Sequence, residues 1–170
     1  LMFKGAKRYS GEQLESVLQS NGGVNNAFTT HDYTAYFIEL PSSKLELALD
    51  MESDRMQFLQ VNAANLKSER EVVKEERRFR VDDSPMGSLM EAIYATAYRV
   101  HPYRWPVIGF MEDLDNISLE KCMDFYRAHY APNNAVLVLA GDFKSDQVKV
   151  LIEKYYGAIP SQTIVARARP

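Results

Sequence analysis

The sequence predicts an α+β fold, because three observations indicate many helices and few strands in an irregular order. Capping residues and apolar residues at helical spacing recur along most of the chain. Two segments near the N-terminus, residues 24–30 and 33–40, have instead the aromatic and β-branched composition of strands. These elements do not alternate strictly between strand and helix, which argues against a regular βαβ architecture.

The composition is that of a globular protein with one domain. The 170 residues, of which 46% are hydrophobic and 25% charged, are enough to bury a core. A net charge of −3 without a basic cluster gives no support to nucleic-acid binding, and no apolar run is long enough for a membrane span. Cys122 is the single cysteine, so there is no internal disulfide framework. We therefore expect a soluble protein with neither a nucleic-acid partner nor a membrane span.

The first elements are predicted from their capping and turn residues. Ser10 and Gln13 form a capping box that starts a helix, and Asn21-Gly22-Gly23 ends it because glycine accepts the left-handed conformation. The two strand segments are joined by His31-Asp32, which suggests a hairpin, and Pro41 stops the second strand.

The remaining elements are helices, with one further strand. Ser43 and Glu46 form a second capping box, which starts a helix that continues to about residue 59. Pro85 suits the first turn of a helix, and Ser118 suits a helix N-cap. The predicted elements after residue 60 are helices at 65–81, 85–97 and 118–130, a buried strand at 135–140 and a helix at 145–156.

The helix predicted over residues 65–81 carries two carboxylates on its apolar side. At about 100° per residue, Glu69 and Glu76 fall in one narrow arc, whereas Glu75 points elsewhere. The other members of this arc are Leu66, Val73 and Arg80. A carboxylate on an apolar face costs free energy unless a cation or a metal pairs with it. The alternative interpretation is a highly charged helix that is solvated all round.

Local motifs do not identify a chemistry. His31, His101 and His129 are not spaced like a metal-binding pair, and each has an ordinary structural role as the alternative. The chain has no nucleophile elbow, no phosphate-binding loop and no dinucleotide-binding glycine pattern.

Four separated segments carry a stronger signal. They are Gly22–Tyr36, Glu69–Arg77, His101–Tyr103 and Tyr130–Ala135. Together they resemble the pitrilysin/insulinase family of zinc peptidases, and within it the bacterial processing-protease type that is similar to the mitochondrial processing peptidase β subunit. The resemblance implies one half-unit of that fold, a mixed sheet covered by several helices. It makes residues 1–160 a partial N-terminal, metal-carrying domain, and residues 161–170 a loose tail or the start of an interdomain linker.

The resemblance also implies a zinc site that this chain contains only in part. The family signature H-x-x-E-H supplies two zinc-binding histidines and a general base, and a distal glutamate supplies the third protein ligand. Residues Leu1–Gly5 match the segment directly after that signature, so the third ligand falls on Glu76. Glu69 becomes a supporting acid that orients the site from outside the ligand set. We therefore expect Zn²⁺ in the intact protein, and neither tight zinc binding nor peptide hydrolysis by this chain alone.

Substrate and partners follow from the same resemblance. Asn26, Ala27, Phe28 and Thr29 match the strand that pairs with an extended peptide through backbone hydrogen bonds. A homologous C-terminal half or partner subunit would close a chamber around an unfolded polypeptide. Strands that precede the zinc helix would be missing here, so we expect the fragment either to self-associate or to be marginally stable. The compartment, bacterial cytoplasm or periplasm, stays undetermined.

Two other functional classes remain open. The first is a non-catalytic structural or partner subunit of the same fold, similar to the core proteins of the respiratory bc1 complex. The presence of both Glu69 and Glu76 argues against it, because a site without metal has no need of acids on an apolar face. The second is an unrelated α+β binding domain, for which the agreement of all four segments would be accidental.

Overall fold

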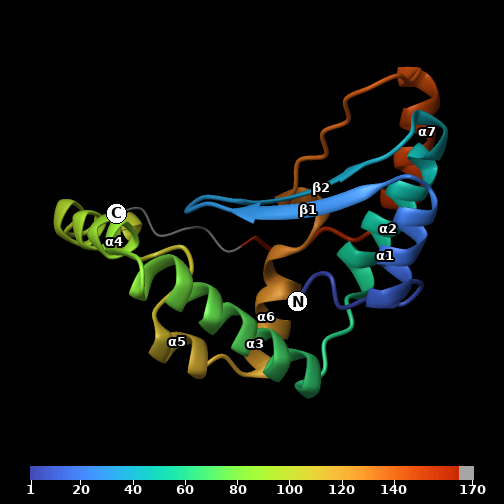
Figure 1. Cartoon of the computed structure of the whole chain (residues 1–170). Coiled ribbons are helices and arrows are strands. Elements are labelled where there is room, and N and C mark those ends of the chain that lie inside the picture. Colours follow the sequence, from blue (N-terminus) through green and yellow to red (C-terminus); the bar gives the residue numbers. More distant parts are fainter. Residues whose placement is uncertain (165–170) are drawn as a thin grey trace. The chain divides into compact units, whose positions relative to one another are not determined.

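The computed structural model describes residues 1–164, and its helix-rich architecture confirms the α+β prediction (Figure 1). The helices and strands are α1 (Gly11–Ser20), β1 (Val24–Thr29), β2 (Thr34–Glu39), α2 (Leu45–Phe58), α3 (Ala63–Arg77), α4 (Pro85–Ala97), α5 (Met111–Asp115), α6 (Leu119–His129) and α7 (Ser145–Tyr156). Contacts divide the described residues into two compact units. The first contains residues 1–27, 36–61 and 122–164, and the second contains residues 28–35 and 62–121.

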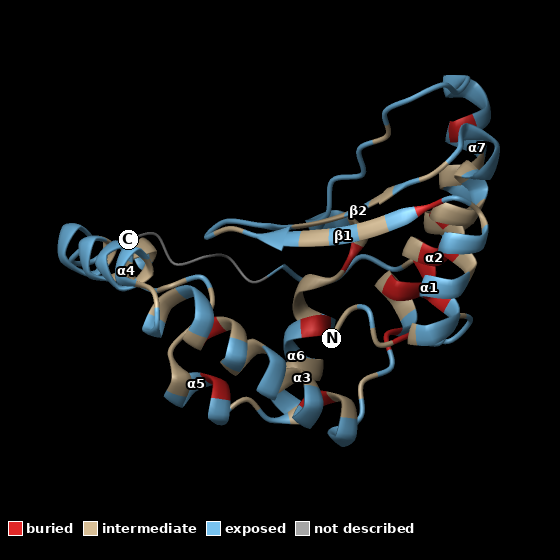
Figure 2. Ribbon diagram, viewed as in Figure 1, coloured by how far each residue is buried: buried red, intermediate tan, exposed pale blue. Residues whose placement is uncertain are grey.

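The core of the first unit is built from α1 and α2. The predicted capping box starts α1, since Ser10 Oγ accepts from the Gln13 N–H and Gln13 Oε1 accepts from the Ser10 N–H. Leu14 and Leu18, one helical turn apart, then meet Met51 of α2 in a buried cluster (Figure 2). The partly buried side chains packed against the cluster are Tyr9, Val17, Ile38, Leu40 and Leu47.

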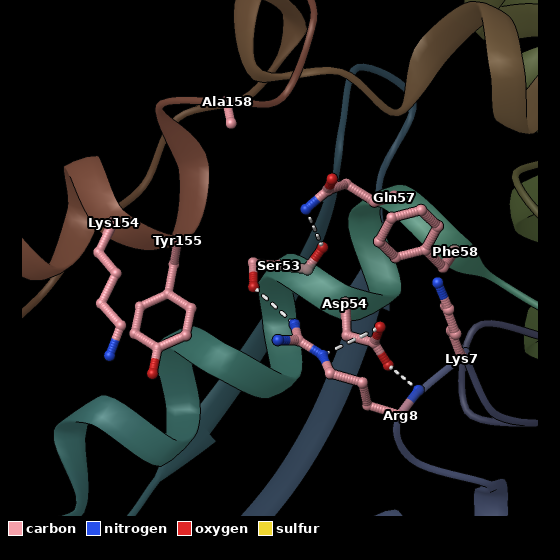
Figure 3. A pocket seen from close by; sticks show the side chains of 9 residues that line it. All are labelled: Lys7, Arg8, Ser53, Asp54, Gln57, Phe58, Lys154, Tyr155 and Ala158. Carbon is pink, nitrogen blue, oxygen red and sulfur yellow. Dashed lines mark hydrogen bonds and ion pairs between the residues drawn. The ribbon is translucent and has the colours of Figure 1, made fainter.

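An ion pair with a buried carboxylate fixes the segment before α1 onto α2. Asp54 has no exposed surface, and its Oδ2 accepts a 2.8 Å hydrogen bond from the Arg8 N–H (Figure 3). Arg8 Nε lies 3.2 Å from Asp54 Oδ1, an ion pair rather than a hydrogen bond. Because a buried carboxylate is costly without a partner, Arg8 is the group that allows Asp54 to sit inside the unit.

A hydrogen bond from a tyrosine hydroxyl joins the same two parts of the chain, and it makes the free energy of unfolding vary with pH in the alkaline range. Tyr9 donates a 2.5 Å hydrogen bond to Asp50 Oδ2. Burial, followed by this hydrogen bond to a carboxylate, raises the pKa of Tyr9 from 10.0 to about 12. Burial also raises the pKa of Tyr36, whose hydroxyl lies 2.6 Å from that of Tyr130.

We therefore expect the free energy of unfolding to fall as the pH rises from about 10 to 12. The unfolded chain loses the Tyr9 proton near pH 10.0 and the folded chain only near 12, so this stabilisation is complete below pH 10 and lost as the pH approaches 12. Tyr9→Phe should lower stability at pH 8 and flatten the decline, as measured by urea titrations between pH 8 and 11.5. An equally steep decline in the variant would contradict this role for Tyr9.

The second unit contains α3, α4 and α5. The Asn62 side chain caps α3 by accepting a 2.8 Å bond from the Asn65 N–H, so the helix begins two residues before the predicted start. After Arg77 the chain does not continue as an α-helix: Arg78–Asp82 form a π-helical turn, which we call the π-turn. The prediction of one regular helix over 65–81 is wrong in this last turn.

A glycine explains how α4 can lie so close to the π-turn. An ideal Cβ on Gly87 would lie 2.0 Å from the Arg80 carbonyl oxygen and 2.9 Å from Val81 Cα. Only a residue without a side chain allows this approach. Pro85 lies in the first turn of α4 as predicted, and the cap is Ser84, whose Oγ accepts from the Gly87 N–H. No residue of α4 is buried (Figure 2).

Two further predicted details are wrong. Ser43 and Glu46 do not form a capping box, because Glu46 Oε1 instead accepts from Lys154 Nζ at 2.7 Å and from the Tyr155 hydroxyl at 2.9 Å. Residues 135–140 form no strand, since they pair with no other strand within residues 1–164, and Val136 is 89% exposed. A strand needs a neighbouring strand to bond its backbone N–H and C=O groups. The apolar run has the composition of a strand, but composition alone does not supply that neighbour.

The helices predicted from Ser118 and over residues 145–156 are confirmed, and Ser118 Oγ accepts from the Lys121 N–H. The predicted tail begins without helix or strand at residues 161–164, where Gln162 exchanges two hydrogen bonds with Asn133. Residues 165–170 of that tail lie outside the described part of the chain. Among residues 1–164, no helix is both long and apolar enough to cross a membrane.

Candidate functional site

The two predicted carboxylates lie on α3 as half-buried side chains. Leu66 marks the buried side of the helix with 6% exposure, and Glu69 and Glu76 lie at the margin of that side. The Glu76 side chain is 41% exposed, and its Oε1 lies 3.1 Å from Arg80 of the π-turn. Glu75, as predicted, faces solvent with 70% exposure and pairs with Arg78. Glu76 is therefore a carboxylate at a helix end, open to solvent on one side and paired with an exposed cation.

The buried charge of α3 is Arg77, which the sequence analysis missed. This residue is 6% exposed, and its guanidinium donates to both carboxylate oxygens of Glu91, at 3.0 and 3.2 Å. It also donates a 2.7 Å bond to the Gly109 carbonyl and lies 3.3 Å from Asp82. The hydrogen bonds that the Arg77 guanidinium donates to Glu91 raise its pKa above the usual value, so the cation is permanent.

Helical geometry contained the signal for Arg77. At about 100° per residue, Arg77 lies only about 20° from Leu66, whereas Glu76 lies about 80° away on the other side. Arg70 lies about 40° from Leu66, and its guanidinium donates to the Ile117 carbonyl. A prediction that took Leu66 as the centre of the buried side would have placed Arg70 and Arg77 on that side.

The described residues do not form a complete metal site. No group of three histidine, cysteine, aspartate or glutamate side chains within residues 1–164 is arranged to hold a metal ion. The histidines have structural surroundings: His31 stacks on Tyr94 with ring centroids 5.5 Å apart, His101 Nδ1 accepts from the Tyr103 N–H, and His129 contacts Phe125. A catalytic zinc needs three protein ligands, and one carboxylate at Glu76 does not meet that requirement.

The candidate substrate strand is β1, which forms a two-stranded sheet with β2 in the described part of the chain. Asn26, Phe28 and Thr29 have exposed side chains, and Ala27 is partly covered. Asn26 Oδ1 accepts a 2.8 Å hydrogen bond from the Ala27 N–H, so one backbone donor of this strand is bound to a side chain. With β2 as its one partner in residues 1–164, β1 has an edge that a further strand could join.

The turn between β1 and β2 is held by an aromatic cluster, which consists of His31, Tyr94, Tyr98, His101 and Tyr103. The Tyr103 hydroxyl donates to the Asp32 carboxylate in the turn, and the His31 ring lies 4.6 Å from that of Tyr103. The His101–Tyr103 segment therefore fixes the end of the hairpin.

A pocket in the first unit is not a candidate site (Figure 3). Its lining includes Arg8 and Lys154, but Arg8 is held by Asp54 and Lys154 by Glu46. Lys7 lies over the Phe58 ring, 5.2 Å from its centroid. The carboxylates at Asp54 and Glu46 thus balance two of the pocket's three cations, and the pocket offers little net charge to an anion.

Comparisons with known proteins agree with the fold and the predicted resemblance. Residues 1–109 match the family described as insulinase (peptidase family M16), and residues 116–170 match the peptidase M16 inactive domain. The chain is 36% identical over 159 residues to the zinc protease PqqE of Helicobacter pylori, covering 94% of this chain and 36% of that protein. A crystal structure of a protease from Helicobacter pylori superposes with a TM-score of 0.94 at 35% identity, covering 100% of this chain and 41% of that one.

A further relative is named as a subunit of a complex rather than as a protease. The chain is 30% identical over 161 residues to human cytochrome b-c1 complex subunit 1, covering 94% of this chain and 33% of that protein. The chain thus spans about a third of the length of both curated relatives.

Proposed function

Because the chain belongs to the insulinase family, peptidase family M16, we propose that the whole protein is a zinc-dependent endopeptidase. Its substrates are peptides or unfolded polypeptides, which it hydrolyses in a closed chamber. The observation that carries this proposal is Glu76, a carboxylate 41% exposed at the end of α3 with an exposed arginine beside it. A carboxylate in this setting can exchange its arginine partner for a metal ion.

Glu76 is the zinc ligand that this chain supplies. The two further ligands and the general base come from residues outside this chain, in the H-x-x-E-H pattern that the resemblance implies. When bound, zinc lowers the pKa of a water molecule towards neutrality and polarises a peptide carbonyl. This chain alone is therefore expected to bind zinc weakly and to leave peptides intact.

Glu69 has a supporting role in this proposal. It lies two helical turns before Glu76, about 10 Å along the axis, which favours an outer position over direct ligation. A half-buried acid at that distance orients ligands or water through hydrogen bonds.

The edge of β1 binds the substrate. Asn26, Ala27, Phe28 and Thr29 present it, and the exposed side chains on this strand support that assignment. Binding through the backbone reads little sequence, which suits an enzyme of unfolded chains. Asn26 Oδ1 must release the Ala27 N–H if an incoming strand is to use that donor.

We assign residues 1–160 to a partial metal-carrying domain and residues 161–170 to a tail or linker. A homologous C-terminal half, or a partner subunit, completes the chamber. The exposed apolar residues Val136 and Val138 support self-association of the isolated chain.

Zinc content and peptide cleavage test this function in two proteins, the present chain and a version extended to the length of its relatives. We expect stoichiometric zinc by atomic emission, and cleavage of an unstructured fluorogenic peptide, only in the extended protein. A chelator should remove both, and added zinc should restore them. An extended protein that is folded but holds no zinc would overturn the proposal.

The alternative is a non-catalytic subunit of the same fold. It is favoured by the 30% identity to human cytochrome b-c1 complex subunit 1, whose name describes a subunit of a mitochondrial complex. In that case neither protein would hold zinc, and Glu76 and Arg80 would be a surface ion pair. The zinc measurement therefore separates the two functions.

A further inference from the structure

Arg77 joins four parts of the second unit around one buried guanidinium. It is the last residue of α3, and it reaches Glu91 of α4, the carbonyl of Gly109 before α5 and Asp82 at the end of the π-turn. The guanidinium also lies over the Phe110 ring, 5.6 Å from its centroid. No other charged side chain of α3 is buried among the described residues.

An apolar residue would fill this place at a lower cost in desolvation. A buried cation is costly to hold, and replacement of a buried ion pair by apolar side chains is often neutral or stabilising. The planar guanidinium instead makes hydrogen bonds of fixed direction. It binds both oxygens of Glu91 in fork geometry and donates a third bond to the Gly109 carbonyl. Arg77 therefore specifies the orientation of the helix end rather than merely filling space.

The orientation of this helix end determines where Glu76 and its partner Arg80 lie. Glu76 precedes it, and Arg80, the partner of Glu76, belongs to the π-turn that follows. In the π-turn the Asp83 N–H bonds to the Arg78 carbonyl at 2.8 Å, so the side chains there leave the α-helical register. Arg77 contacts Asp82 at the far end of this turn and so constrains both members of the Glu76–Arg80 pair.

We propose that Arg77 is a positioning residue that aims the Glu76 carboxylate at the zinc ion, through its bonds to Glu91, Gly109 and Asp82. The inference rests on the proposed zinc site. A ligand must be held within about 0.5 Å of its productive position, and a helix end that frays would not do so. Loss of the Arg77 bonds thus weakens zinc binding, while the substrate strand β1 keeps its own contacts.

The test uses the extended protein with Arg77→Met, Arg77→Lys and Glu91→Gln. Zinc affinity is measured by competition with a chromogenic chelator, and kcat, KM and the thermal midpoint are measured beside it. Arg77→Met should lower zinc affinity by roughly 10- to 100-fold and lower kcat with little change in KM. Arg77→Lys, which keeps the charge without the fork, should fall between Arg77→Met and wild type. Glu91→Gln keeps Arg77 in place and should give a smaller loss, so it serves if Arg77→Met does not fold.

Lys74→Met is the matched control. Lys74 lies on the same helix and pairs with Asp115 at 2.8 Å, so its loss also removes an ion pair between α3 and α5. We expect unchanged zinc affinity in this variant. If wild type holds zinc and the Arg77 and Glu91 variants lose only thermal stability, Arg77 is structural and the inference is overturned. A wild-type protein without zinc overturns the proposed function and this inference with it.

Discussion

Glu76→Gln in the extended protein is expected to abolish peptide hydrolysis and to reduce zinc content to a trace. The amide is a poor zinc ligand without charge, whereas the shape of the side chain is almost unchanged. The loss of activity should exceed the roughly 10- to 100-fold that changes to supporting groups cost. Removal of the Glu76–Arg80 pair should change stability little, because the Arg80 side chain is 69% exposed and solvent screens the pair. Zinc content, cleavage rate and thermal midpoint measure these effects.

Glu75→Gln is the control for this experiment. It makes the same chemical change one residue earlier, on a side chain that is 70% exposed and paired with Arg78. We expect wild-type zinc content and cleavage in this variant. Full activity in Glu76→Gln, or equal losses in both variants, would show that Glu76 is not the ligand.

Gly87→Ala is expected to destabilise the second unit by about 3 kcal/mol or more, at the upper end of the range for overpacking. The new methyl carbon would lie 2.0 Å from the Arg80 carbonyl oxygen, and a backbone atom cannot rotate away as a side chain can. Either α4 or the π-turn must shift. Because Asp82 of the π-turn contacts Arg77, which positions Glu76 in our proposal, zinc affinity of the extended protein should fall as well.

Met86→Ala is the matched control, since Met86 is the preceding residue of α4 and 65% exposed. We expect its free energy of unfolding to stay within about 0.5 kcal/mol of wild type in urea titrations. Similar stability of Gly87→Ala and wild type would mean that α4 does not need a close approach at Gly87.

Local signals predicted the elements well where a cap and its helix are neighbours in sequence. Ser10 with Gln13 and Ser118 each start a helix, because their hydrogen bonds close within a few residues, and Pro85 lies in the first turn of α4. The Ser43–Glu46 box failed for the opposite reason. Its glutamate is bound by Lys154 and Tyr155, more than 100 residues away, and no local pattern contains that competition.

The candidate site was predictable to a similar extent. Four separated segments indicated the family, and the comparisons confirm it. The roles of Glu76, Glu69 and the β1 residues stay predictions until zinc and substrate binding are measured. Arg77 was not predicted because the prediction was centred on Glu69 and Glu76. The structure buries the side of α3 that Leu66 marks, about 80° around the helix from Glu76. The π-turn depends on Gly87, which makes its contact only after α4 has folded back.

The division of the chain into two units sets an order for folding during synthesis. The second unit consists of residues 28–35 and 62–121, so it can be completed once residue 121 has emerged from the ribosome. The first unit brings residues 1–27 and 36–61 together with residues beyond 122, and α7 packs on α2. Its N-terminal segments must therefore wait for the C-terminal ones, and loop closure over that separation is slow. During the wait, the N-terminal segments lack the contacts that the later helices supply, such as the hydrogen bonds of the Tyr126 hydroxyl with the Leu59 N–H and the Met56 carbonyl.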